Sequence, residues 1–96
     1  MPLTPMQIRD TADKAAVLVT TNDLAVEFVH IDALTTRPVV RVTMESFRRA
    51  FVGCDVERLP GVVDGWVYRI VRDGICIEAE ERVPAGRVPA SEVVRL

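Results

Sequence analysis

Several residue types are scarce in this 96-residue sequence, and each scarcity excludes a class of site. Histidine occurs once, at His30, and cysteine twice, at Cys54 and Cys76, without the clustered spacing of a zinc site. We therefore expect no metal, and two free thiols as in a reducing cytoplasm. Lysine occurs once among twelve cations, and the acids outnumber the bases by 14 to 12. Extended nucleic-acid-binding surfaces are usually net basic, so nucleic acid is the less favoured partner.

Long apolar runs and glycine-rich loops are missing as well. Charges interrupt the apolar stretches well before the roughly 20 residues that cross a bilayer. Asp10 and Asp13 fall where a signal peptide would carry its apolar segment. The five glycines are scattered through the chain, and none opens a helix after a strand as a nucleotide-binding loop would. We expect no membrane association, a cytoplasmic location and no cofactor.

What the chain does contain is aliphatic residues. Hydrophobic residues make up 49% of the sequence, and seventeen of them are valine. Valine is stiff and β-branched, which favours strands. The length fits one domain, spanning 1–96, with a core that needs no metal or disulfide.

The segment 66–82 predicts a β-hairpin. Asp73 and Gly74 form a two-residue type I′ turn signal, because both central positions of such a turn need positive φ. Folding the chain about this turn sets Ile70 opposite Ile77 and Arg69 opposite Glu78. One face is then mostly apolar and the other charged, as in a sheet with one buried side.

Two helices are predicted. Thr4 is a good N-cap for a helix from Pro5 to about Lys14, with Gln7 completing a capping box. Residues 15–21 either continue this helix or form a strand, and their β-branched content favours the strand. Thr43 caps a second helix over 44–52, with Phe47 and Phe51 on its buried side and Gly53 at its end.

The remaining segments complete an α+β domain. A strand over 24–31 has apolar residues on both sides, which is typical of a central strand, and a short strand follows over 39–42. Residues 54–65 read as a loop and 83–96 as a flexible tail. The expected order is α-β-β-β-α-β-β, with a mainly antiparallel sheet of about five strands and two helices packed on one face.

No catalytic set emerges from the spacing. His30 shares its predicted strand face with Val26 and Phe28, and no nucleophile or carboxylate is placed to complete a triad. Cys54 follows the C-terminal end of a helix, where the helix dipole disfavours a thiolate. The acids at 55 and 57, and at 78, 80 and 81, fit a solvated face. We therefore expect a protein that is not an enzyme.

The remaining candidates for a functional surface are charged residues around the second helix. Arg41, Glu45, Arg48 and Arg49 are the expected partner-binding residues, because arginine is enriched among binding hot spots. By elimination and size, we expect stoichiometric binding to another protein, as a regulator, adaptor or inhibitor; phage-encoded antagonists of host defence and immunity proteins are analogues. The alternative is a nucleic-acid-binding regulator that uses Arg41, Arg48 and Arg49. The identity of the partner and a homodimer both stay open.

Overall fold

Six strands and two helices make up the structure, a computed structural model that describes residues 3–31, 37–61, 65–82 and 92–96. In chain order the elements are α1 (Pro5–Asn22), β1 (Val26–His30), β2 (Val39–Val42), α2 (Met44–Ala50), β3 (Asp55–Pro60), β4 (Gly65–Arg72), β5 (Ile75–Arg82) and β6 (Glu92–Arg95). Neither helix within these described ranges is long and apolar enough to cross a membrane.

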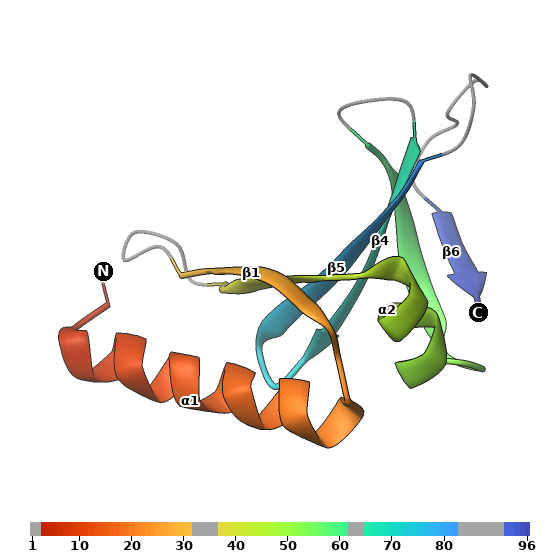
Figure 1. Cartoon of the computed structure of the whole chain (residues 1–96). Coiled ribbons are helices and arrows are strands. Elements are labelled where there is room, and N and C mark those ends of the chain that lie inside the picture. The colour runs from red at the N-terminus through yellow and green to blue at the C-terminus, as the bar shows by residue number, and fades with distance from the viewer. Residues whose placement is uncertain (1–2, 32–36, 62–64, 83–91) are drawn as a thin grey trace.

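All six strands join one sheet, in the order β1-β2-β5-β4-β3-β6 (Figure 1). Every pairing is antiparallel except that of β2 with β5. The expected α+β class and the mainly antiparallel sheet are confirmed, with six strands in place of about five and the order α-β-β-α-β-β-β-β.

The core lies on one face of this sheet. Alternate residues of the central strands are buried there, and Phe47, Phe51 and Ala15 bring the two helices onto the same side. The other face receives no helix from the described part of the chain and carries most of the charged strand residues; we call it the open face. Two helices on one face of the sheet is the expected arrangement.

The hairpin has the predicted register at all seven predicted pairs, including Ile70 with Ile77 and Arg69 with Glu78, and the pairing extends to Gly65 with Arg82. Asp73 and Gly74 adopt φ of 51° and 76°, as a type I′ turn requires. The predicted caps are also present. Thr4 and Gln7 form a capping box, and the Thr43 hydroxyl accepts a hydrogen bond from the backbone N–H of Ser46.

Residues 15–22 are helical, so the preference for a strand there was wrong. The side chains of Thr20 and Asn22 donate hydrogen bonds to the carbonyl oxygens of Ala16 and Leu18, at 2.9 Å each. Helix α1 ends at Asn22, and the following C-cap residue, Asp23, takes the left-handed conformation at φ 51°. Packing of Ala15 in the core therefore outweighs the weak strand preference of its β-branched neighbours.

The strand over 24–31 was expected to be central, but β1 is an edge strand whose five residues are all exposed. The register also shifts between Val26 and Phe28. This bulge sets Val26 beside the buried Val42 and Phe28 beside Arg41, on opposite faces. His30 therefore shares a face with Phe28 but not with Val26.

Two strands occupy segments expected to lack them. Asp55–Pro60 forms β3 inside the predicted 54–65 loop, and Glu92–Arg95 forms β6 inside the predicted tail. Both depend on pairing with distant partners, β3 with β4 and β6 with β3. Residues 62–64 of that loop and 83–91 of that tail lie outside the described residues.

Candidate functional site: the open face

A row of alternating charges crosses the open face. Register places Arg41 of β2 beside Glu78 of β5, Glu78 beside Arg69 of β4, and Arg69 beside Glu57 of β3. We call Arg41, Glu78, Arg69 and Glu57 the charge ladder. Opposite charges directly across strands stabilise a sheet. Arg41 with Glu78 and Arg69 with Glu57 form ion pairs, while the buried Nε of Arg41 has no hydrogen-bond partner among the described residues.

The ladder is more buried at one end. Arg41 forms ion pairs with Glu78 at 3.4 Å and with Glu80 at 3.1 Å, and the side chains of Arg41 and Glu78 are 19% and 15% exposed. Arg69 pairs with Glu57 at 2.9 Å, where Glu57 is 49% exposed. The acids at 78 and 80 are therefore ion-paired and partly buried, whereas the sequence indicated a solvated face.

Apolar residues flank both ends of the ladder. Phe28 of β1 pairs with Arg41 in the register, and the Arg41 guanidinium lies 5.6 Å from the Phe28 ring centroid. Val93 of β6 pairs with Glu57 at the other end. Phe28, Val93 and Val71 are 51%, 70% and 39% exposed. The open face thus combines paired charges with exposed apolar side chains.

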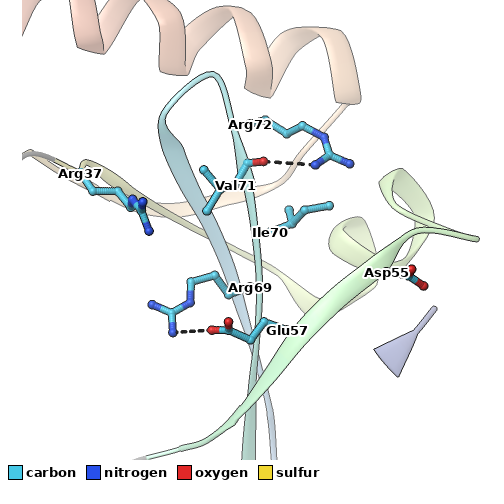
Figure 2. A pocket seen from close by; sticks show the side chains of 7 residues that line it. All are labelled: Arg37, Asp55, Glu57, Arg69, Ile70, Val71 and Arg72. Carbon is cyan, nitrogen blue, oxygen red and sulfur yellow. Dashed lines mark hydrogen bonds and ion pairs between the residues drawn. The ribbon is translucent and has the colours of Figure 1, made fainter. Parts of the chain in front are cut away.

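A depression of about 420 Å³ lies beside the ladder (Figure 2), lined by Arg37, Asp55, Glu57, Arg69, Ile70, Val71 and Arg72. Figure 2 shows Arg37 and Arg69 extending to one side of the β4–β5 hairpin, while Arg72 points to the other side. Five of the seven lining residues are charged, whereas sites for small organic ligands are mostly apolar. This lining fits contact with a polar, charged surface of a partner better than it fits the binding of an enclosed small molecule.

Cys76 lies on the open face between these strands, yet it is only 1% exposed. Its burial raises the pKa of the thiol, and Glu78 raises it further, while Arg69 and Arg37 act in the opposite direction. A thiol with a raised pKa is a poor nucleophile at neutral pH. Both cysteines are free thiols, as predicted.

The four residues predicted to bind a partner do not form one patch. Arg41 belongs to the charge ladder on the open face, whereas Glu45, Arg48 and Arg49 lie on α2, which packs on the opposite face. Arg48 pairs with Glu81 and lies 5.4 Å from the Tyr68 ring centroid; the hydrogen bond that the Arg48 guanidinium donates to the Glu81 carboxylate raises the pKa of Arg48.

Arg49 also has a partner within the chain. Its guanidinium donates a hydrogen bond of 2.9 Å to the backbone carbonyl oxygen of Asp23 and forms an ion pair of 3.6 Å with the Asp23 carboxylate. Glu45 stands four residues before Arg49 on the same helix, a spacing that favours an ion pair within the helix. Contacts across elements therefore replace the expected contact within the helix.

Sequence reasoning missed Glu57 and the ladder as a whole. Glu57 lies in the segment 54–65, which the sequence predicts as a loop. The parallel pairing that brings Arg41 beside Glu78 joins distant segments and produces no pattern among neighbouring residues of the sequence. The one available signal was the opposed pair of Arg69 and Glu78 in the hairpin, which is the centre of the ladder.

The fold and this face define a small α+β domain with a charged sheet surface that no helix among the described residues covers. Comparison with protein families, with curated protein sequences and with solved structures gives no match.

Proposed function

We propose that this chain acts without catalysis, by binding another protein stoichiometrically on the open face as a regulator, adaptor or inhibitor. The observation that carries the proposal is the exposure of Phe28, Val71 and Val93 around a ladder of already paired charges. Apolar anchors provide binding energy, and fixed charges impose register and specificity on the partner.

The charge ladder also indicates the chemistry of the partner surface. The two arginines and two glutamates of the ladder carry no net charge together, so neither a polyanion nor a polycation is favoured. A partner surface with apolar residues and a few charges of both signs fits this face best. The alternative of nucleic-acid binding needs Arg41, Arg48 and Arg49 together, and Arg41 lies on the face opposite the other two.

Two variants separate the open face from the surface of α2. Val71→Glu places a charge among the exposed apolar residues, at a position exposed enough to tolerate it. The double variant Arg48→Ala with Arg49→Ala alters α2 alone. The partner is captured from a lysate of the source cells, purified, and titrated calorimetrically with wild type and both variants.

We expect one partner per chain and a loss of more than about tenfold in affinity for Val71→Glu, roughly 1.4 kcal/mol. The double arginine variant should bind as wild type does. If the arginine variant loses binding and Val71→Glu does not, the partner surface is α2, as the sequence first suggested. A gel shift on random DNA that weakens steeply with salt would support the nucleic-acid alternative instead.

A further inference from the structure

The two edges of the sheet differ in a way that bears on assembly. At β6, the end residues Glu92 and Arg95 form ion pairs with Arg58 and Asp55 of the neighbouring strand, and between them Val93 is 70% exposed. At β1, all five residues are exposed, and Phe28 and Val29 are 51% and 47% exposed. Charged edges resist pairing with another strand, whereas apolar edges invite it.

The bulge in β1 decides which residues can pair regularly with a further strand. Beyond it, residues 28–30 alternate normally, with Phe28 and His30 on the open face and Val29 on the helix side. Val26 lies before the bulge and faces the helix side. A second strand can therefore continue the sheet over residues 28–30 but loses register at Val26.

Helix α1, which leads into β1, is also poorly covered. One of its eighteen residues, Ala15, is buried, and Val17 remains 64% exposed. Figure 1 shows α1 and β1 at the same end of the molecule.

We propose that two copies of this chain associate through β1, pairing antiparallel about a two-fold axis at Val29. Antiparallel pairing of identical edge strands is self-complementary, so it closes after two copies. An axis at Val29 sets Phe28 opposite the partner's His30 on the open face, and the two Val29 side chains against each other on the helix side. An axis at Phe28 would set His30 against the partner's Val26, which the bulge turns to the other face.

The association does not depend on the proposed function. It uses the β1 edge and the exposed surface of α1. Of the three apolar residues of the proposed binding surface it engages Phe28 and leaves Val71 and Val93 uncovered. A dimer would present two open faces within one continuous sheet of twelve strands. A variant that abolishes the dimer is therefore expected to keep the one-to-one binding of a partner.

The test compares the same substitution on the two edge strands. Light scattering after size exclusion gives the mass of wild type, Val29→Lys and Val93→Lys over a wide concentration range. Wild type should reach twice 10.7 kDa. Val29→Lys should raise the dimer dissociation constant more than about tenfold, because a lysine on an edge strand opposes pairing. Val93→Lys, on β6, should behave as wild type.

A second measurement needs no variant. Amide hydrogen exchange of Val26–His30 in the wild-type protein should slow as concentration rises, because pairing protects the outward amides of β1. A wild-type mass of one chain at every concentration, with rapid exchange of these amides, overturns the proposal. A dimer that survives Val29→Lys, or that Val93→Lys disrupts, also overturns it by locating the interface elsewhere.

Discussion

Arg41 is the residue on which the charge ladder depends most, because it pairs with both Glu78 and Glu80. Replacing it with methionine keeps much of the side-chain volume but leaves two carboxylates near each other on one strand face. Glu78 is 15% exposed, so water compensates little for the lost partner. We expect Arg41→Met to lower the free energy of unfolding by about 1 to 3 kcal/mol at neutral pH.

Arg69→Met is the matched control for this change. Its partner Glu57 is 49% exposed and remains solvated when the arginine is removed. We expect a loss of less than about 1 kcal/mol. Urea unfolding of both variants measures the difference, and equal small losses would mean that water solvates the ladder along its whole length.

Because of Cys76, we expect the free energy of unfolding to fall at alkaline pH. Burial raises the pKa of its thiol in the folded state above the ordinary value of about 8.5. Below that pKa the thiol is protonated in both the folded and the unfolded state, so its full contribution to the free energy of unfolding is present. As pH rises above it, the unfolded chain releases the proton first, so the free energy of unfolding falls until the folded thiol also ionises.

Urea midpoints measured from neutral pH upward should show this decline. Cys76→Ala should have a flatter profile across the same range, since it removes the titrating group. A profile identical to that of wild type would assign the alkaline loss to other residues.

At the scale of elements, the sequence correctly predicted the features that depend only on residues close together in the chain. The hairpin register follows from Asp73 and Gly74 together with local alternation, and all of its pairs are as expected. The caps at Thr4 and Thr43 are local as well. The start of each helix and the hairpin could therefore be derived before any tertiary contact was known, whereas the end of α1 at Asn22 was not.

Elements that depend on distant partners could not be derived in this way. Asp55–Pro60 has a single buried residue, Val56, and is a strand because β4 and β6 pair with it on both sides. The apolar residues of β1 suggested a central strand, yet they lie at an edge. In both cases the local pattern was compatible with another structure, and pairing across the sheet decided the outcome. The charge ladder was missed for the same reason.

The attachment of α1 to the rest of the molecule is the weakest feature among the elements. Ala15 is 3% exposed and is its one buried residue, whereas the next residue, Ala16, is exposed. Ala15→Glu would insert a charge into the core contact, and Ala16→Glu would place the same side chain in water. Burying an unpaired charge is costly, so the helix should detach instead of accommodating it.

We expect Ala15→Glu to lower the free energy of unfolding by about 1 to 3 kcal/mol and to speed amide exchange throughout α1. Ala16→Glu should leave both nearly unchanged. Circular dichroism and hydrogen exchange measure the two effects. Equal behaviour of the variants would show that the docking of α1 does not rest on Ala15.

At the scale of the whole molecule, two halves of the chain meet in one core. The first half supplies α1, β1, β2 and α2, and the second supplies β3 to β6. They are joined by the parallel pairing of β2 with β5 and by α2, whose Phe47 lies 5.0 Å from Phe51 and 6.4 Å from Tyr68 between ring centroids. Phe47 is fully buried at this junction.

Two signals report separately on these halves. Both helices lie in the first half, so far-UV circular dichroism follows mainly that part, whereas Trp66, the single tryptophan, lies in the second. If the core is shared, the two signals must change together on unfolding. Phe47→Ala should then shift both transitions by the same amount, costing about 3 to 5 kcal/mol.

Val52→Ala, at an exposed position just after α2, is the control and should shift neither transition. The measurement is a urea titration followed by circular dichroism and by tryptophan fluorescence on the same samples. Coincident curves for wild type and for Phe47→Ala are expected, because the aromatic cluster links α2 to β4 directly. A shift confined to circular dichroism would mean that the helices unfold from a sheet that remains intact, and that the core is not shared.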